Sequence, residues 1–503
     1  MKNQNRKKQG ESAAKCKKED YISKLPNSII CYILSYLKVK DAVTTSVLSS
    51  KWRNISCNPS NLILDEDNML IKREHSLTYV LLHQSVVQRL EFKRDRTLAF
   101  VSNVNMYLSH VEEVQKIDKL KVCFTFRHNE YGSTDLDRWI RFAVEKNVEE
   151  IDLCLLEENH HHQINASPND GYYVFPCEVV GNYEGESGSK SFLKSLRLAH
   201  CVLAPHMLHN LGFSTLTTME LFKVDLKSEL HIQILLSSCS NLEFFGLSEC
   251  YNMKNLKIEH PYCQKLKYLK VKLCQELKKL VLYSTSLEAL EFKGSKIEFV
   301  FDAPRLKTFY SPVSDTDACH KELWPVFRLP IDIPQLETLI MECSCNMGKV
   351  MTNRLPTLTF PCLRHLEVIK VSTQRQDLWW VARILKACPM LQRLELHLKT
   401  YLCIDDDVRE RGWPPKFEHN HLKEVVITGI KGYLCEIEIA IYLLRNAISL
   451  EKMTIDPRAK VYTENGKWGQ AEAFGNWSRV GKPKVHRHLK QEANSSAVEL
   501  LIK

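Results

Sequence analysis

Apolar residues recur along most of the chain in a six-residue pattern, with apolar side chains at the first, fourth and sixth positions. The fourth and sixth residues are two apart, so on a β-strand both side chains point to the same face. Between residues 193 and 287, and again between 336 and 450, successive matches begin 21 to 31 residues apart. The matches cover residues 87–92, 117–122, 148–153, 193–198, 216–221, 242–247, 266–271, 287–292, 336–341, 363–368, 391–396, 422–427 and 450–455.

This spacing is the period of leucine-rich repeats, about 20–29 residues, slightly stretched near its end. Each match predicts a short strand that lies beside the next in a parallel sheet, because one repeat cannot bury its own apolar face. Each buried leucine contributes roughly 1.5–3 kcal/mol. The residue between the two apolar positions is expected to face solvent. Charged residues there fit a surface that determines binding specificity, and they are equally what an exposed sheet face requires. Such positions include Arg197, Glu220, Lys270, Glu291, Glu367 and Glu395.

Two further matches, at residues 253–258 and 277–282, fall between regular ones. Strands then follow one another every 10 to 13 residues, which is too short for a helix on the outer face, so we expect tight loops there. Residues 157–191 interrupt the rhythm with four glycines and three consecutive histidines, His160–His162. That segment predicts a long insertion loop.

Residues 20–57 have a different pattern, which predicts three short helices. The first follows Pro26, a residue suited to a first helical turn. Asp41 is a suitable cap for the second helix, and Trp52 lies in the third. A unit of under 40 residues buries little surface and needs a partner or a neighbouring domain for firm stability, which suggests a docking module. The apolar residues at helical spacing in the first helix are Ile29, Ile30, Ile33, Leu34 and Leu37.

Charge and cysteine content limit the compartment. The net charge of the 503 residues is +9, and much of it lies in residues 1–18, which predict a disordered basic tail. Arg6–Lys8 and Lys15–Lys18 fit a nuclear-import address, and a solvated tail is an equal alternative. The N-terminus lacks an apolar leader, and no apolar run approaches the roughly 18 residues of a membrane helix. We therefore expect a nuclear and/or cytoplasmic protein without membrane contact.

Eighteen cysteines in a reducing compartment are expected to be mostly free thiols packed as small apolar side chains. Positions beside the predicted strands suit that role, namely Cys154, Cys201, Cys274 and Cys388.

The N-terminal sequence closely resembles the plant F-box motif. The resemblance lies in DYISKLPNSII at residues 20–30, ILSYL at 33–37, KDAVTTSVLS at 40–49 and SKWR at 50–53. Further along, DAPRL at residues 302–306 matches a phrase of the F-box/FBD/LRR-repeat family. Residues 421–458 are similar to its FBD segment, notably YLLRNA at 442–447 and LEKMTIDPR at 450–458. The resemblance spans about residues 20–458.

The resemblance implies that the F-box binds a Skp-type adaptor and through it a cullin. The family's adaptor-facing residues map onto Leu25, Pro26, Ile29, Ile30, Ile33, Leu34 and Leu37, and its packing residues onto Val43, Val47 and Trp52. The alternative is that all ten form a helical core. We prefer the interface for Leu25 and Pro26. Lys38, Thr44 and Ser56 replace the family's usual proline, arginine and tryptophan, changes expected to weaken adaptor affinity.

Catalytic motifs are missing. The sequence has no nucleophile elbow, phosphate loop, zinc-protease helix or dinucleotide fingerprint. Cys343 and Cys345 lack a second pair at finger spacing, and His160–His162 favour a polar loop. We therefore predict a non-catalytic protein with no cofactor and no metal site, and we do not expect nucleic acid to be a partner.

The predicted fold class is α/β, with an N-terminal three-helix F-box followed by a leucine-rich-repeat solenoid with a parallel β-sheet. The expected function is substrate recognition in a Skp–cullin–F-box ubiquitin ligase, with an unidentified target protein. The alternative is a ligase-independent repeat module with a degenerate F-box. The expected segments are residues 1–18 (tail), 19–60 (F-box), 61–420 (leucine-rich repeats), 421–460 (FBD-like repeats) and 461–503 (a divergent tail).

Overall fold

The computed structural model divides into two compact units, residues 1–118 and 119–503. The predicted tail at residues 1–18 lies outside the described residues, as does most of the second and third F-box helices. The described residues are 24–35, 52, 60–70, 86–112, 116–124, 133–155, 172–180, 191–205, 213–259, 262–313, 329, 331–343, 359–372, 378–400, 413, 415–470, 477, 480–493 and 497–503.

The first unit contains the predicted F-box helix. Helix α1 spans Asn27–Ser35 and begins directly after Pro26, as predicted. Strand β1 (Asn61–Asp65) leads into the one-turn helix α4 (Glu66–Met69), where Asp65 Oδ1 accepts the Asn68 N–H at 2.9 Å. Such an N-cap satisfies a helical N–H that has no partner within the helix.

The strand predicted at residues 87–92 is wrong, because this segment lies inside α6 (Val86–His110). The buried residues of α6 include Phe100, Val104 and Leu108, which are four apart and line one side of a helix. That helical period overrides the single six-residue match. In this unit the side chain of Asn103 donates to the Met69 carbonyl at 2.7 Å and ties α6 to α4.

The second unit is built on the predicted parallel sheet, whose strands pair in parallel throughout. The fourth residue of each match lies opposite its counterpart, as with Leu196, Met219 and Phe245. In order, the strands are β2 (Lys119–Cys123), β3 (Glu150–Cys154), β4 (Ser195–Ala199), β5 (Thr218–Phe222), β6 (Phe244–Ser248), β8 (Tyr268–Lys272), β10 (Ala289–Lys293), β12 (Thr308–Val313), β13 (Thr338–Cys343), β14 (His365–Ser372), β15 (Arg393–Thr400), β16 (Glu424–Thr428), β17 (Lys452–Asp456) and β20 (Glu499–Ile502).

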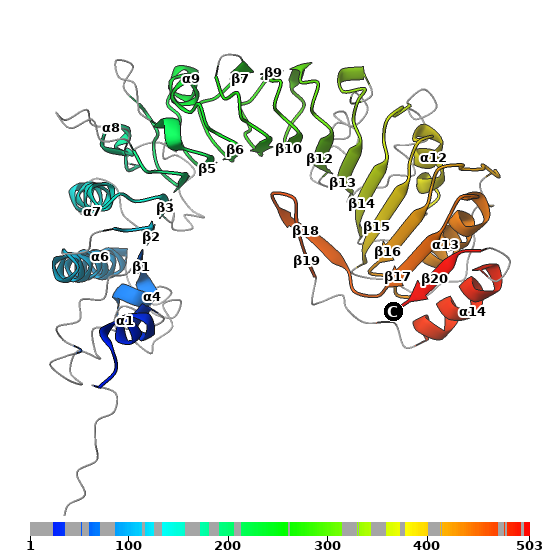
Figure 1. Ribbon diagram of the computed structural model, residues 1–503, viewed down its shortest axis with the longest axis horizontal. Helices are drawn as coiled ribbons and strands as arrows, with labels where there is room; N and C mark the ends of the chain where they lie inside the picture. The colour runs from blue at the N-terminus through cyan, green and yellow to red at the C-terminus, as the bar shows by residue number, and fades with distance from the viewer. Residues whose placement is uncertain are drawn as a thin grey trace, which may run out of the picture. The chain divides into compact units, whose positions relative to one another are not determined.

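Helices cover one face of this sheet (Figure 1). Residues on their apolar sides, such as Trp139 and Leu235, are fully buried. Crossing a membrane takes a long apolar helix, and the described part of the chain contains none that meets both requirements. The covering elements are α7 (Ser133–Glu145), α8 (Cys177–Val180), η1 (Phe213–Thr215), α9 (Glu229–Ser238), α12 (Trp380–Ala387) and α13 (Leu434–Asn446).

A second sheet replaces the tight loops expected near residues 253–282. Strands β7 (Asn255–Glu259), β9 (Lys279–Tyr283) and β11 (Glu298–Asp302) pair in parallel as a separate sheet in the order β11-β9-β7. An extended strand covers about 3.3 Å per residue against 1.5 Å for a helix. In a short repeat, the segment that leads to the next strand of the large sheet is therefore itself a strand and not a helix. Leu256 and Leu280 on these strands are fully buried.

Part of the predicted insertion loop contributes side chains to the core of the second unit. Within residues 157–191, the described part includes residues 172–180, where Phe175 and Cys177 are buried; His160–His162 lie outside the described residues. The cysteine expectation holds where it is described. Cys201, Cys274 and Cys388 are buried free thiols, and Cys154 is a half-buried one. Burial raises the pKa of Cys201 and of Cys388 to about 12, so both stay protonated.

The described residues between 460 and 503, where the repeat pattern predicts no structure, form two strands of a hairpin, a helix and a further sheet strand within the second unit. Strands β18 (Lys460–Glu464) and β19 (Lys467–Gln470) form an antiparallel hairpin. Helix α14 (Gly481–Ala493) packs beside α13, and Arg445 Nε donates to Glu492 Oε2 at 2.8 Å. Strand β20 then pairs with β17 and extends the sheet.

Two glycines make this C-terminal packing possible. Gly432 has a φ of +94°, and a Cβ atom there would lie 2.5 Å from the Cα of Gly481 at the start of α14. Gly466, in the turn of the hairpin, has a similar φ of +74° but open space around it.

We predict that Gly432→Ala destabilises the protein by at least about 1 kcal/mol more than Gly466→Ala. Both variants place a side chain in the left-handed region, which costs about 1–2 kcal/mol, but only Gly432→Ala also forces two backbones apart. Urea denaturation monitored by circular dichroism measures the difference. Equal losses would show that α14 does not approach Gly432 this closely.

Asp456, in the FBD phrase at the end of β17, is tied to two cations. Its Oδ1 accepts the backbone N–H of Arg458 at 2.9 Å, and its Oδ2 lies 3.0 Å from the Arg458 guanidinium and 3.4 Å from Lys503 Nζ. Burial alone would raise the pKa of Asp456, but the hydrogen bonds from Arg458 and Lys503 hold it below its usual value.

A carboxyl group with a lowered folded-state pKa stabilises the fold above its unfolded pKa of about 3.9, and this contribution is lost as pH falls through the folded pKa. We therefore expect the free energy of unfolding of the wild type to fall more steeply between pH 5 and pH 3 than that of Asp456→Asn. The exposed Asp302→Asn is the matched control and is expected to keep the wild-type slope. Identical slopes for all three proteins would contradict the pairing.

Candidate protein-binding site

The first candidate surface is the apolar side of α1 in the first unit. Ile29 is 45% exposed and Ile33 is 37% exposed, one helical turn apart, and Pro26 is exposed at the start of the helix. Tyr32, 62% exposed, adds to this surface; sequence reasoning missed it, although it lies three residues from Ile29. Exposed apolar side chains gathered on one helix are typical of a surface that enters a partner's groove.

The other predicted F-box residues lie differently. Ile30 is fully buried, so it belongs to the packed side of α1 and not to the exposed side. Leu25 is half-buried, and Trp52 is buried, as a packing residue would be. The side chains of Leu34, Leu37, Val43 and Val47 lie outside the described residues, and the roles predicted for them stay predictions.

The second candidate surface lies in the second unit, on the sheet face opposite the helices. We call it the polar face, and it carries the residue between the two buried apolar positions of each strand. The β18–β19 hairpin lies against this face (Figure 1). At the turn, Asn465 Nδ2 donates to Glu220 Oε1 on β5 at 2.9 Å. At its base, Lys460 Nζ lies 3.1 Å from Glu395 Oε2 on β15.

Tyr462 is the central contact of the hairpin. Its hydroxyl donates to Glu291 Oε2 at 3.0 Å and accepts the Gly466 N–H at 2.8 Å, and its ring stacks on Tyr310 with centroids 4.0 Å apart. Tyr268 donates to the same Glu291 oxygen at 2.8 Å. Burial and the Glu291 carboxylate raise the pKa of both Tyr268 and Tyr462, so both hydroxyl groups remain hydrogen-bond donors.

The hairpin corrects the expectation that the charged strand positions face solvent. Arg197 remains half-exposed, and Glu220 is half-buried beneath Asn465. The others are buried, because the hairpin and the neighbouring strands cover them. These buried residues are Lys270, Glu291, Glu367 and Glu395. No repeat match marked residues 460–470, so the sequence carried no signal for this cover.

The negative charge of the Glu395 carboxylate is compensated by two cations, one at each oxygen. Arg393 NH2 lies 2.7 Å from Oε1, and Lys460 Nζ lies 3.1 Å from Oε2. Burial by itself would raise the pKa of Glu395, but contacts with His365, Lys460 and Arg393 outweigh it and hold the pKa well below its usual range. Glu395 is therefore ionised, and Lys460 anchors the hairpin electrostatically.

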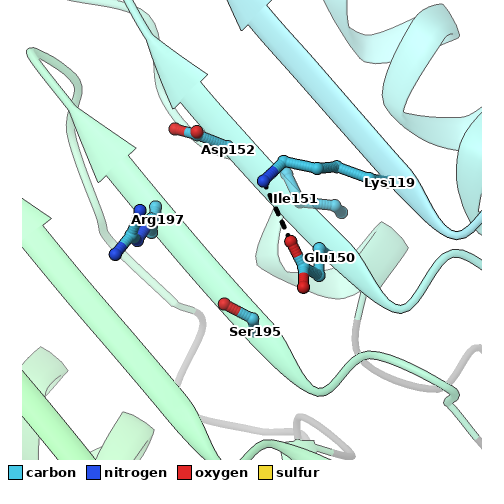
Figure 2. Close-up of a pocket in the computed structure, with 6 residues that line it drawn as sticks. All are labelled: Lys119, Glu150, Ile151, Asp152, Ser195 and Arg197. Atoms are coloured by element: carbon cyan, nitrogen blue, oxygen red, sulfur yellow. Dashed lines mark ion pairs between the residues drawn. The ribbon is translucent and has the colours of Figure 1, made fainter. Parts of the chain in front are cut away.

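A small depression lies on the polar face at β2, β3 and β4 (Figure 2), lined by Lys119, Glu150, Ile151, Asp152, Ser195 and Arg197. Lys119 Nζ pairs with Glu150 Oε2 at 3.0 Å. Arg197 pairs with Glu220 on the next strand at 2.7 Å. The depression thus offers charges of both signs and the Ser195 hydroxyl, a surface suited to a polar protein segment.

The structure combines an N-terminal helical unit with a parallel repeat sheet, and comparison with known proteins identifies both parts. An F-box domain model matches residues 22–64. The model described as At1g61320/AtMIF1, LRR domain, matches residues 108–476, well over half of the chain.

Relatives carry the same architecture. The chain is 25% identical to the FBD-associated F-box protein At5g22730 of Arabidopsis thaliana, over 89% of this chain and 90% of that protein. It is 26% identical to the F-box/FBD/LRR-repeat protein At1g13570 of the same plant, over 46% and 44% of the two chains. The chain belongs to this plant F-box/FBD/LRR-repeat family, as its motifs indicated. In two further Arabidopsis F-box proteins the match spans 39% and 32% of their length, so the chain covers less than half of several relatives.

Proposed function

We propose that this protein is a substrate-recognition subunit of a Skp–cullin–F-box ubiquitin ligase. The observation that carries the proposal is the exposed apolar side of α1, formed by Pro26, Ile29 and Ile33, within the segment that matches the F-box domain. Apolar residues exposed in helical register are costly in water unless a partner covers them. A Skp-type adaptor is the partner that the F-box match supports.

The F-box and repeat architecture is typical of non-catalytic adaptor proteins. In the proposed complex the chemistry belongs to the conjugating enzyme that the cullin carries. The receptor contributes proximity, because a bound target has a high effective concentration near the activated ubiquitin. The basic clusters at residues 1–18 support a nuclear as well as a cytoplasmic location.

The target is proposed to bind the polar face at β2–β4, where the depression of Figure 2 lies. The hairpin contacts strands from β5 to β15, so Glu291 and Glu395 are occupied within the chain itself. Lys119, Asp152 and Arg197 form a mixed-charge surface that suits a target with complementary charges. Rim charges of this kind mainly set association rate and partner choice.

The proposal predicts that a plant Skp-type adaptor binds the full-length protein, and that Ile29→Ala/Ile33→Ala weakens binding at least tenfold, about 1.4 kcal/mol. Leu25→Ala/Pro26→Ala is expected to act in the same direction. Ile448→Ala is the matched control, because Ile448 is 62% exposed but lies in the second unit. Isothermal titration measures the affinities, and circular dichroism checks the fold of each variant.

Absence of adaptor binding by the folded wild type, together with failure to co-purify with a cullin, would favour the ligase-independent alternative. The departures at Lys38 and Thr44 are the observation behind that alternative. Lys38→Pro/Thr44→Arg, which restores the family's usual residues, separates the two cases. Recovered binding would show that these two residues alone had weakened the F-box.

A further inference from the structure

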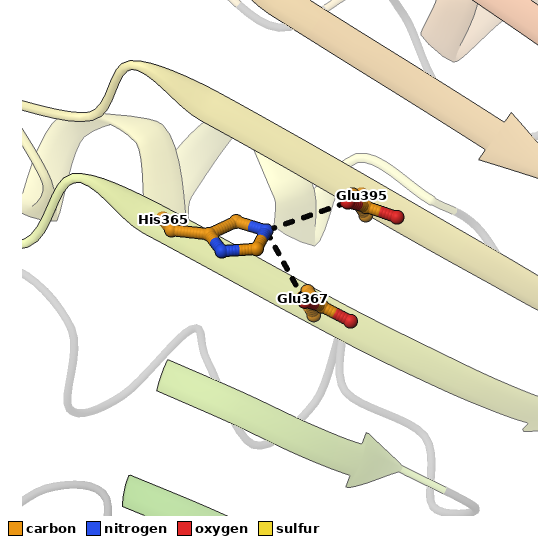
Figure 3. A group of neighbouring side chains, drawn as sticks. All are labelled: His365, Glu367 and Glu395. Carbon is orange, nitrogen blue, oxygen red and sulfur yellow. Dashed lines mark ion pairs between the residues drawn. The ribbon is translucent and has the colours of Figure 1, made fainter. Parts of the chain in front are cut away.

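Four side chains of β14 and β15 meet on the polar face beneath the hairpin. We call them the histidine–glutamate cluster: His365, Glu367, Glu395 and His397. Alternate residues of one strand point to the same face, and Glu367 lies directly opposite Glu395 in the parallel register. Figure 3 shows the His365 ring directed between the two carboxylates.

The distances in the cluster match the edges of a metal coordination sphere. His365 Nε2 lies 3.2 Å from Glu367 Oε1 and 3.5 Å from Glu395 Oε1. One ligand atom from each of these three residues lies within 4.8 Å of the others. For Zn²⁺ with bonds of about 2.0–2.1 Å, neighbouring ligand atoms in a tetrahedron are about 3.4 Å apart. A cation between the three atoms would need little rearrangement.

The charge balance calls for a cation at the same place. Two carboxylates directly opposite each other repel, and a buried carboxylate needs a compensating charge. Arg393 and Lys460 compensate Glu395. Glu367 has no cation within ion-pair distance among the described residues other than the two histidines, with His397 Nε2 3.6 Å from its Oε2, and Arg393 acts on it only from farther away.

The histidine nitrogens give an independent indication. The Nε2 atoms of His365 and His397 are buried, and neither has a hydrogen-bond partner. His397 is fully buried, and its Nδ1 lies 2.9 Å from Thr428 Oγ1. That contact fixes the ring with Nε2 directed at both carboxylates, 3.6 Å from an oxygen of each.

We propose that the histidine–glutamate cluster binds one divalent transition-metal ion of the Zn²⁺ class, with His365, Glu367 and Glu395 as ligands. His397 faces the other oxygens of the same carboxylates and closes the site beside Trp468 of the hairpin, with ring centroids 4.7 Å apart. Imidazole nitrogen with carboxylate oxygen favours such ions over Mg²⁺. The ion would link β14 to β15 and hold the residues on which β18 and β19 rest.

This proposal departs from the sequence-based expectation of no metal site. The ligands come from two repeats, at positions that a repeat sheet ordinarily exposes, and the 28-residue separation of Glu367 and Glu395 resembles no metal motif. Register alone brings them together.

The test uses full-length protein in which His160–His162 are replaced by alanine, because consecutive histidines bind metal adventitiously. After chelator treatment and dialysis, Zn²⁺ affinity is measured by competition with a chromogenic chelator, and Mg²⁺ serves as the contrasting ion. We expect one Zn²⁺ per chain and no comparable Mg²⁺ binding. Glu367→Gln should weaken Zn²⁺ binding at least tenfold, whereas Glu451→Gln, at an exposed glutamate paired with Lys423, should not.

A second measurement and a second variant distinguish loss of the metal site from failure of a variant to fold. Zn²⁺ should raise the melting temperature of the parent protein but not of Glu367→Gln. His365→Gln, at a half-buried position, is the second ligand variant if Glu367→Gln fails to fold. Absence of Zn²⁺ binding by the parent protein, or equal affinity in the parent and the ligand variants, would overturn the proposal.

Discussion

Each strand of this repeat sheet has an apolar face that must be buried and a polar face whose charged side chains must be paired. The architecture of the second unit meets both requirements. The apolar pair of each strand, such as Leu394 and Leu396, must be buried by neighbouring repeats and by a covering layer. Helices form that layer where the repeats are long, and the β7–β9–β11 sheet forms it where they are short. The polar face instead needs partners for its charges, and the hairpin supplies them.

The contacts of the β18–β19 hairpin indicate that the second unit requires the hairpin for its stability. Glu291 and Glu395 are buried carboxylates. Removing Tyr462 would take one hydrogen-bond donor from Glu291, and removing Lys460 would take one of the two cations from Glu395, so both losses are expected to destabilise the fold. The hairpin also divides the polar face. The strands beneath it are committed to the chain's own residues, and the surface at Lys119, Asp152 and Arg197 stays available to a partner. The exposed side of α1, in the other unit, offers a separate apolar surface.

Periodicity predicted the sheet because burial repeats with the chain. It failed where the rule changes locally: Ser311 occupies an apolar position of β12, so that strand was missed, and Leu90 fits a strand match inside a helix. The hairpin and the histidine–glutamate cluster were out of reach for another reason. Tyr462 meets Glu291 across 171 residues, and such a contact depends on how many strands separate the two in the folded sheet. No local sequence pattern encodes the number of strands between two residues.

The central claim, that the C-terminal hairpin covers the polar face, is tested most directly by a double-mutant cycle between Tyr462 and Glu291. The free energies of unfolding of wild type, Tyr462→Phe, Glu291→Gln and the double variant give their coupling energy. The structure predicts a coupling of about 1 kcal/mol or more, because the half-buried Tyr462 hydroxyl donates to the buried carboxyl group of Glu291. The exposed Tyr283→Phe, combined with Glu291→Gln, should give none. A coupling near zero for Tyr462 and Glu291 would contradict the account, since the two residues would then not meet.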